Sequence, residues 1–462
     1  MPPSLQTSSP RRGFHVMTKP IGPACNLKCS YCFYLEKSRL HPSEGNFRMS
    51  DTVLEAYIRQ YLDAQPGNEV LFAWQGGEPT LLGVDFFRRA VDLEKRYANG
   101  RRVANAFQTN GVLLDDAWGE FLAREKFLVG LSVDGPRAIH DRHRVDKGGQ
   151  SSFDRVMAGL AFLKKHGVEF NTLTVVGAHN SRAPLEVYRF LKEAGSGFLQ
   201  FIPLVERLPD ANAAGLGLDF ATPPAPGKGD ARPAMTPWSV KAEDYGAFLV
   251  AIFEEWVRRD VGRVFVQMFD VALGIWAGEG PGLCVFAEEC GDALALEHNG
   301  DLYACDHYVY PAWRRGNLLE TPLAELAGGE AQRRFGADKK ATLPRECREC
   351  DVRFACNGGC PKHRFLRAPD GEGGLNVLCA GYRRFFRHVA PAMEAMAHLL
   401  RTGRAPAEIM ERFRERDRLA TVRPDVRCPC GSGRKFKNCC GRSAAATSIP
   451  PATTARSRPV RA

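Results

Sequence analysis

The sequence predicts an α/β protein whose main domain is an open barrel of six strand-and-helix units. Short β-type runs alternate with amphipathic helical patterns between residues 14 and 204, which is typical of a parallel sheet covered by helices. Of the 462 residues, 44% are hydrophobic and 25% are charged, so the chain has enough apolar material for a large core. The predicted strands are residues 14–18, 69–74, 103–109, 128–133, 168–176 and 198–204.

Two helical segments between these strands carry clear end signals. Ser50 is a predicted N-cap, and the apolar residues of 53–62 recur at helical spacing on one face. Residues 152–166 repeat this pattern, with Gly167 as the C-cap before the next strand. Because the functional groups of parallel barrels lie just after the strands, we expect the site at the carboxyl ends of these six strands.

The second half of the chain has a different organisation. Residues 208–238 are rich in Ala, Pro and Gly without apolar periodicity, which indicates a surface loop or linker. An amphipathic helix with a buried apolar stripe is predicted over residues 243–259. Asn299-Gly300, between two alternating runs, predicts a β-hairpin with a type I′ turn, whose second strand would end at Cys305.

Positive charge is concentrated at the C-terminus. The net charge is +10, yet residues 401–462 hold 15 Lys and Arg against 5 Asp and Glu, so the first 400 residues are neutral overall. A neutral body argues against a general nucleic-acid binder. No apolar run of about 18 residues occurs and residues 1–15 lack a secretory signal, so we expect a cytoplasmic protein without membrane insertion. Residues 443–462 are expected to be disordered.

Fifteen cysteines in a chain without an export signal favour metal ligation over disulfides, because the cytosol keeps thiols reduced. They form groups of three, eight and four. The group of eight cysteines suits two fully ligated tetrahedral or cubane sites, and the group of four suits one more. The group of three leaves one metal coordination position open for a substrate or cofactor. The groups are Cys25, Cys29 and Cys32; Cys284, Cys290, Cys305, Cys347, Cys350, Cys356, Cys360 and Cys379; and Cys428, Cys430, Cys439 and Cys440.

The trio lies directly after the first predicted strand, in CNLKCSYCFY. In isolation, Cys25-x3-Cys29-x2-Cys32 could belong to a zinc site, but its place at a strand end of a βα-repeat domain favours catalysis. The motif resembles that of radical S-adenosylmethionine (SAM) enzymes. The resemblance implies that the three thiolates hold a [4Fe-4S] cluster whose fourth iron chelates the amino and carboxylate groups of SAM.

Further motifs near successive strand ends extend this resemblance. WQGGEPT follows the second strand, and its glycines Gly76 and Gly77 would let a ligand approach the backbone closely. QTNG, LSVDGP, HDRHR and QFIPLVER are individually common loops, yet together they resemble a SAM-lining set. The resemblance assigns SAM contacts to Tyr31, Gly77, Ser132, Arg144 and Leu204.

The eight middle cysteines read C-x5-C-x14-C and, later, C-x2-C-x5-C-x3-C-x18-C. Two zinc ribbons are one interpretation. The spacing also closely resembles a SPASM domain with two auxiliary [4Fe-4S] clusters. Because each of these clusters would have four cysteine ligands and no iron free to bind a substrate, their expected role is electron transfer. By that resemblance one cluster is held by Cys284, Cys290, Cys305 and Cys360, and the other by Cys347, Cys350, Cys356 and Cys379.

Asp306 follows Cys305 in CDHYVYP, and RRGN comes soon after. A carboxylate in a solvated turn is the ordinary interpretation of such a residue. However, about residues 14–390 closely resemble anaerobic sulfatase-maturating enzymes, in which the Asp after this cysteine is the general base. The resemblance implies oxygen-independent oxidation of a sulfatase Cys or Ser to Cα-formylglycine, in which a SAM-derived radical takes hydrogen from the β-carbon and the auxiliary clusters accept an electron.

The segment CPCGSGRKFKNCC, near the C-terminus, resembles the SEC-C zinc motif. Four thiolates that close a small loop describe a structural zinc site, which supplies folding energy to a module too small for its own core. The expected zinc ligands are Cys428, Cys430, Cys439 and Cys440.

These resemblances define the expected organisation: a partial (β/α)6 radical SAM barrel (12–235), a linking helix and SPASM domain (236–395), a helical, basic linker (396–424) and the SEC-C motif (425–442). Expected partners are an unfolded or nascent sulfatase precursor and a low-potential electron donor, but not nucleic acid. Two alternatives stay open. One is another SPASM peptide modification such as thioether crosslinking, and the other is a zinc-rich interaction scaffold without catalysis.

Overall fold

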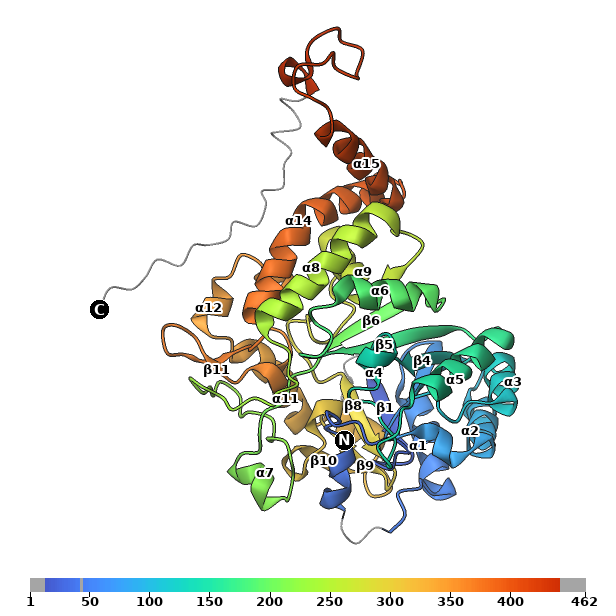
Figure 1. The fold of residues 1–462 in the computed structure, drawn as a ribbon. Coiled ribbons are helices and arrows are strands. Elements are labelled where there is room, and N and C mark those ends of the chain that lie inside the picture. Colours follow the sequence, from blue (N-terminus) through green and yellow to red (C-terminus); the bar gives the residue numbers. More distant parts are fainter. Residues whose placement is uncertain (1–12, 42–44, 441–462) are drawn as a thin grey trace, which may run out of the picture.

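The computed structural model describes residues 13–41 and 45–440 (Figure 1). Ten strands form one sheet in the order β10-β9-β8-β1-β2-β3-β4-β5-β6-β7. All six predicted strands are present, each close to its predicted bounds. They are β1 (His15–Lys19), β2 (Glu69–Trp74), β3 (Arg102–Thr109), β4 (Leu128–Ser132), β5 (Phe170–Val176) and β6 (Phe198–Pro203).

The strands from β1 to β6 pair in parallel and in chain order, so their carboxyl ends share one edge of the sheet. A short strand, β7 (Phe265–Val266), pairs with β6. Among the described residues β7 and β10 do not pair with each other, so the barrel is open, as predicted. The helices between the strands are α1 (Asp51–Ala64), α2 (Val84–Tyr97), α3 (Asp116–Arg124), α4 (Arg137–His140), α5 (Phe153–Lys165) and α6 (Pro184–Glu193).

Local sequence signals set the ends of these helices. The Ser50 hydroxyl accepts a hydrogen bond from the Val53 backbone N–H (3.2 Å), as expected of the N-cap of α1. The predicted apolar face of α1 is buried in the core of the barrel. Gly167 follows α5 with a φ of 65°, a left-handed conformation that glycine adopts without steric cost.

The sheet continues past β1 into the second half of the chain. There, β8 (Ala293–Glu297) pairs in parallel with β1, while β9 (Asp301–Tyr303) and β10 (Arg314–Asn317) extend the sheet in antiparallel fashion. The segment that carries Cys305 and Asp306 is therefore attached directly to the barrel sheet.

The hairpin predicted at Asn299-Gly300 is present, but the prediction of a type I′ turn is wrong. That turn needs a positive φ at both central residues, whereas Gly300 has a φ of 89° and Asn299 does not have a positive φ. The Gly300 N–H donates to the Glu297 carbonyl oxygen (3.0 Å), and three residues connect β8 to β9. A three-residue loop with a left-handed glycine at its end satisfies the same sequence motif.

The helix predicted from residue 243 is α8 (Ala242–Arg259), and it packs beside α14 (Cys379–Arg401) (Figure 1). The two backbones meet at Gly246 and Gly381. A Cβ on Gly381 would lie 2.2 Å from the Ala242 carbonyl oxygen, so this crossing requires glycine. Because α14 begins at Cys379, the crossing also positions that thiol.

Residues 208–238 form a loop, as predicted, except for the short helix α7 (Ala211–Gly215). The Asp210 carboxylate caps this helix by accepting from the Ala213 N–H (2.8 Å). A helix of one turn shows no apolar periodicity, so the sequence pattern did not reveal it. The remaining elements are α9 (Gln267–Ala277), α10 (Leu323–Gly328), α11 (Glu330–Ala341), α12 (Arg345–Arg348), α13 (Arg353–Cys356), β11 (Leu366–Arg367) and β12 (Gly373–Leu375).

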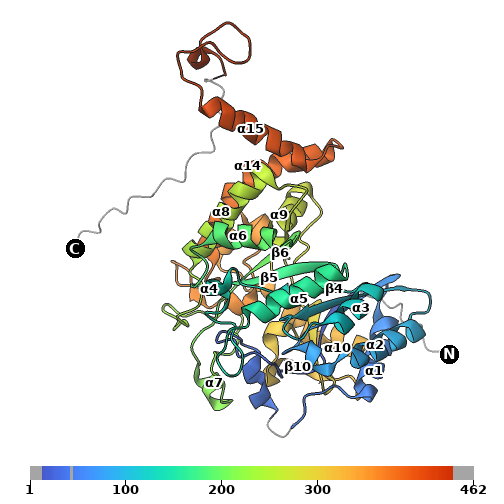
Figure 2. The same ribbon diagram turned by 45° about the vertical axis from the view of Figure 1, so that its right-hand side comes forward.

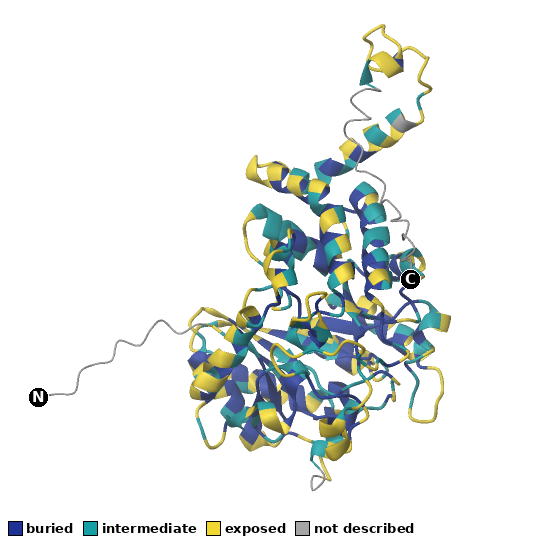
Figure 3. Cartoon of the chain, turned by 90° about the vertical axis from the view of Figure 1, so that its left-hand side faces the viewer, coloured by how far each residue is buried: buried dark blue, intermediate teal, exposed yellow. Residues whose placement is uncertain are grey.

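The last described segment projects away from the body of the molecule (Figure 2). Its first part, α15 (Ile409–Ala420), contacts α8 through an ion pair between Arg258 and Asp417 (3.3 Å) and through the buried ring of Phe413, which lies beneath Arg258. Most residues beyond α15 are exposed (Figure 3). No helix within the described ranges is both long and apolar enough to span a membrane. The segment 443–462, predicted to be disordered, lies outside the described residues.

Candidate active site

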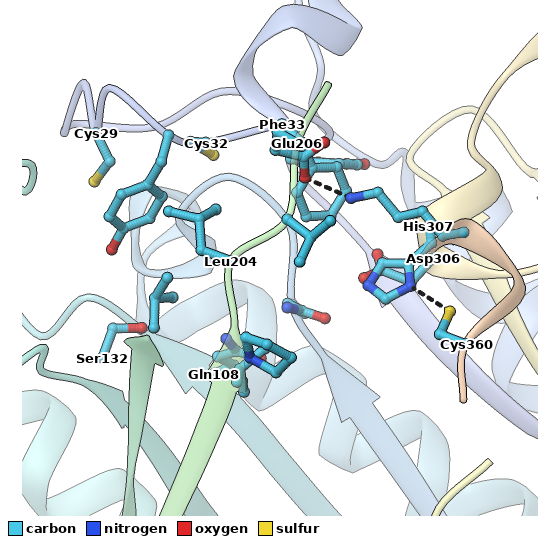
Figure 4. A pocket seen from close by; sticks show the side chains of 18 of the residues that line it. Cys29, Cys32, Phe33, Gln108, Ser132, Leu204, Glu206, Asp306, His307 and Cys360 are labelled. Atoms are coloured by element: carbon cyan, nitrogen blue, oxygen red, sulfur yellow. Dashed lines mark hydrogen bonds and ion pairs between the residues drawn. The ribbon is translucent and has the colours of Figure 1, made fainter. Parts of the chain in front are cut away.

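A cavity of 360 Å³ lies at the carboxyl ends of the barrel strands, where the second half of the chain covers them. Its walls include Cys25, all five residues assigned to SAM contact, and Asp306. Figure 4 shows Cys29 and Cys32 on one side of the cavity, Asp306 on the other, and Leu204 between them. The structure thus brings together site residues that the sequence separates by almost 300 positions.

The three thiols of the CNLKCSYCFY motif are free and partly buried. The pKa of Cys25 and of Cys29 is raised to about 12, mainly by burial, and repulsion from the neighbouring sulfurs contributes to this rise. Asn110 lies beside Cys25, with its Nδ2 3.8 Å from the Sγ. Three soft donors that share one cavity, and whose thiolates need a cation for stability, fit an iron–sulfur cluster with one open iron.

Tyr31 and Arg144 are joined by Asp134, which belongs to the LSVDGP motif after β4. The Tyr31 hydroxyl donates to Asp134 Oδ2 (2.5 Å), and the Arg144 Nε donates to the same oxygen (2.9 Å). Burial opposes ionisation of Asp134, but the Arg144 guanidinium holds the pKa of this carboxyl below its usual value. Asp134 therefore fixes two of the predicted SAM contacts against the cavity wall. Ser132 and Leu204 line the same cavity.

The close approach that Gly77 permits is to the backbone of the chain itself. A Cβ on Gly77 would lie 1.9 Å from the Ala24 carbonyl oxygen. The N–H groups of Gly77 and Glu78 donate to the carbonyl oxygens of Gly22 (2.7 Å) and Ala24 (2.8 Å). The turn after β2 is thereby docked onto the segment that leads into Cys25, while Gly77 still contributes to the cavity wall.

Asp306 has a side chain that is 19% exposed and lies against Lys19, the last residue of β1. The Lys19 Nζ is 2.5 Å from Asp306 Oδ1 and donates to Gln75 Oε1 (3.2 Å). Burial opposes ionisation of Asp306, but Lys19, followed by His307, keeps the pKa of this carboxyl below its usual value. The carboxylate is therefore ionised and oriented within the cavity.

Two further buried contacts that sequence reasoning missed join the barrel to the second half of the chain. The Tyr34 hydroxyl donates to the Glu297 carboxylate. The Lys362 Nζ pairs with Glu206 Oε1 (2.5 Å), and both side chains are at most 10% exposed. Lysines, tyrosines and glutamates carry no motif of their own, so only their burial by a distant segment reveals these roles. One sequence signal could have identified Lys19 as a site residue, namely its position at the end of a predicted strand.

The structure brings the eight middle cysteines together in two groups of four. Thiols of the same group raise the pKa of Cys290, Cys305, Cys360, Cys347 and Cys356, in addition to the larger effect of burial. The second group lines a small cavity of its own. The groups are Cys284, Cys290, Cys305 and Cys360, and Cys347, Cys350, Cys356 and Cys379, the same sets that the SPASM resemblance implies.

The sulfurs of the four C-terminal cysteines all lie within 4.8 Å of one another. Cys439 Sγ is 3.5 Å from that of Cys430 and 4.0 Å from that of Cys440. Tetrahedral zinc with Zn–S bonds of about 2.3 Å separates its sulfurs by about 3.8 Å, so the spacing fits this metal. Hydrogen bonds, first from Ser432, lower the pKa of Cys430 to about 6, which favours the ligating thiolate.

Family models match three parts of the chain. The radical SAM superfamily model covers residues 20–191, the iron–sulfur cluster-binding SPASM domain covers 284–351, and the SEC-C motif covers 427–442. The SPASM match includes the first five of the eight middle cysteines and ends before Cys356, Cys360 and Cys379.

Curated relatives and solved structures cover most of the chain. The serine-type anaerobic sulfatase-maturating enzyme of Bacteroides thetaiotaomicron is 46% identical over 401 residues, which are 87% of this chain and 95% of that protein. The cysteine-type enzyme of Clostridium perfringens is 33% identical over 386 residues, 83% of this chain and 98% of that protein. Native anSMEcpe with bound AdoMet and Cp18Cys peptide has a TM-score of 0.72 at 32% identity, over 84% of this chain and all of that chain. The chain therefore belongs to the anaerobic sulfatase-maturating enzymes of the radical SAM superfamily.

Proposed function

We propose that this protein oxidises the active-site Cys or Ser of a sulfatase to Cα-formylglycine without molecular oxygen. The observation that carries the proposal is the single cavity that the three cysteines of the radical SAM motif share with Asp306. Relatives named as serine-type and as cysteine-type maturating enzymes support it, as does the structure of one of them with AdoMet and a peptide.

Each metal cofactor has a proposed set of cysteine ligands. Cys25, Cys29 and Cys32 hold the first [4Fe-4S] cluster, each middle group of four cysteines holds one auxiliary [4Fe-4S] cluster, and the C-terminal four hold zinc. When bound, SAM and the three clusters supply radical chemistry at an unactivated carbon and sites for the electron that is released. The proposed SAM contacts are Tyr31, Gly77, Ser132, Arg144 and Leu204, all of which line the cavity.

Asp306 is the proposed general base. Its Oδ2 accepts the proton of the target thiol or hydroxyl, while Lys19 holds Oδ1 at 2.5 Å. Loss of this proton makes it easier for the adjacent carbon to give up an electron. Lys19 is itself oriented by Gln75 and by the ring of Tyr34, whose centroid is 4.6 Å from the ammonium.

The remaining wall of the cavity is largely apolar, which limits the access of water to the reacting groups. Phe201, Val205, Met268 and Phe286 contribute to it. Exclusion of water protects reactive species from side reactions. Because the base lies inside this cavity, the target residue must enter on an extended segment, which supports an unfolded or nascent precursor as the substrate.

The proposed domains are residues 12–235, 236–395, 396–424 and 425–442, although α14 continues through residue 395 to Arg401 without a break. We also place the protein in the cytoplasm, where a low-potential electron donor would reduce it. These assignments rest on the motifs and on the thiol-rich composition.

The function is tested by anaerobic incubation of the reconstituted protein with SAM, a reductant and a sulfatase peptide that contains the target Cys. Oxidation removes two hydrogens from the target Cys to give a thioaldehyde, and water then replaces the sulfur, which leaves as hydrogen sulfide. The expected product therefore has the mass change in which SH and H are replaced by O. A peptide with Ala in place of the target Cys is the control and should stay unchanged. A product that has lost two hydrogens only and keeps its sulfur after incubation in water would indicate a thioether and would contradict the proposal.

A further inference from the structure

Two cations are buried beside the middle cysteine groups, and neither has an acidic partner among the described residues. Lys339 is 1% exposed and Arg364 is 4% exposed. Among the described residues, no carboxylate lies within ion-pair distance of either side chain, in contrast to neighbouring Lys340, which pairs with Glu288 (2.5 Å). A buried charge without a counter-charge is costly, so these two cations need an anionic partner.

Lys339 holds the loop between the first two cysteines of one group. Its ammonium donates to the carbonyl oxygens of Cys284 (2.6 Å), Val285 (3.1 Å) and Ala287 (2.5 Å). Three acceptors around one Nζ use all three donors of a protonated lysine. Burial lowers the pKa of Lys339 to about 8, and the groups that raise it are thiols of this cysteine group.

Arg364 holds the loop that carries one cysteine of each group, Cys356 and Cys360. It donates through Nε to the Gly358 carbonyl oxygen (3.0 Å), through Nη2 to that of Asn357 (2.7 Å), and through Nη1 to that of Lys339. Burial lowers the pKa of Arg364, and the groups that oppose this are cysteine thiols of both groups. Arg364 therefore faces both sites, and it contacts the backbone of the other cation.

We propose that Lys339 and Arg364 are redox-tuning residues whose positive charges raise the reduction potentials of the two auxiliary clusters. The inference rests on the proposed function, which places clusters in these cysteine groups. A cluster ligated by four thiolates is anionic, and it gains one more negative charge when it accepts an electron. A fixed cation nearby favours that reduced state, because net charge is one of the factors that set cluster potentials. The two side chains would thus make the auxiliary clusters better electron acceptors.

The test is potentiometric titration with dithionite, followed by electron paramagnetic resonance, in full-length protein that carries Ala at Cys25, Cys29 and Cys32. This background leaves only the auxiliary signals. Lys339→Gln and Arg364→Gln remove charge but keep hydrogen-bond donors, whereas Lys339→Arg and Arg364→Lys keep charge. Lys340→Gln is the matched control, since it removes an exposed and paired lysine one position away.

In each Gln variant, the ratio of reduced to oxidised auxiliary cluster at a fixed potential should be about tenfold lower than in the parent. This corresponds to a midpoint potential that is about 59 mV lower for a one-electron step. Lys339→Gln should shift mainly one signal and Arg364→Gln both, while the charge-keeping variants and Lys340→Gln stay near the parent.

Iron content is measured on every sample. An iron-loaded Gln variant with an unchanged midpoint would overturn the inference. Loss of iron from both Gln variants would also overturn the inference, because it would show that the two side chains are needed to keep the cluster sites folded. Absence of any auxiliary signal in the parent would instead refute the proposed function.

Discussion

Lys19 and Asp306 lie almost 290 positions apart in the sequence and meet 2.5 Å apart in the cavity wall. A buried carboxylate without a partner favours its neutral form, so the lysine is what keeps this acid ready to accept a proton. The opposite wall is organised in the same way, because buried Asp134 holds both Tyr31 and Arg144. At the scale of single residues, one buried ion pair thus orients the groups on each side of the cavity.

Replacing Asp306 by Asn should separate SAM cleavage from substrate oxidation. The variant keeps the size of the side chain and removes the base. We expect 5′-deoxyadenosine still to form, while formylglycine falls by roughly 10²- to 10⁴-fold, the usual effect of losing a general base. Both products are measured by mass spectrometry in the same anaerobic reaction. An unchanged yield of formylglycine would show that Asp306 is an ordinary turn carboxylate and not the general base.

Replacing Lys19 by Met should weaken the base without removing it. Burial raises the pKa of Asp306 and Lys19 is the main group that lowers it, so without Lys19 a smaller fraction of the carboxyl is ionised, and the effect is largest at low pH. We expect the ratio of formylglycine to 5′-deoxyadenosine to fall accordingly. Lys95→Met, which removes an exposed lysine paired with Glu125, is the control. Equal ratios in the two variants would show that Lys19 does not assist the base.

Replacing Cys25, Cys29 and Cys32 together by Ala should remove one cluster and leave two. The parent should bind about twelve iron atoms per chain and the triple variant about eight, at four per cubane cluster. SAM cleavage should be lost. Iron analysis and assay of 5′-deoxyadenosine check this expectation, which SAM cleavage by the triple variant would contradict.

At the scale of elements, glycine contacts dock the parts of the site onto one another. Gly77 lets the turn after β2 contact the cysteine loop, and Gly381 lets α14 contact α8. Each contact lies next to a cysteine proposed as a cluster ligand, Cys25 in the first case and Cys379 in the second. The positions of these thiols therefore depend on backbone approaches that a methyl group would prevent.

Gly381→Ala should destabilise the protein and disturb the site that includes Cys379. The added Cβ would lie 2.2 Å from the Ala242 carbonyl oxygen, and such overpacking costs about 1–3 kcal/mol. We expect a lower Tm and less than the parent amount of iron. Gly328→Ala is the matched control, because a Cβ there meets open space at the end of a helix. A Gly381→Ala protein as stable and as iron-rich as the control would show that the helices can separate freely.

At the scale of the whole molecule, charge and chemistry occupy different parts of the chain. The first 400 residues are neutral overall and contain the eleven cysteines proposed to hold clusters, whereas the excess positive charge lies beyond them. The four zinc-type thiols lie in the projecting segment (Figure 2), which is joined to the body through the contact of α15 with α8. Within the described chain, no residue of the projecting segment lines the cavity.

Deleting residues 424–462 should therefore leave the catalyst intact. This truncation keeps α15 and its contact between Arg258 and Asp417. We expect iron content and peptide oxidation to match those of the full chain, and bound zinc to disappear. Elemental analysis and the formylglycine assay check both points. Loss of peptide oxidation in an iron-loaded truncated protein would show that the zinc module takes part in the reaction.

The sequence by itself determined the six barrel strands and the three groups of cysteines along the chain, because these depend on periodicity and spacing. The division of the eight middle cysteines into two sets and the role of Asp306 were implied by the family resemblance. Only the tertiary structure decided which groups surround Asp306, why Gly77 is glycine, and that Lys339 and Arg364 contact the loops that carry the middle cysteines. It also replaced the type I′ turn at Asn299-Gly300 by a three-residue loop. Single lysines, arginines and glycines look alike along a sequence, and their roles arise only when distant segments bury them together. Burial is a property of the whole fold, so no local pattern encodes it.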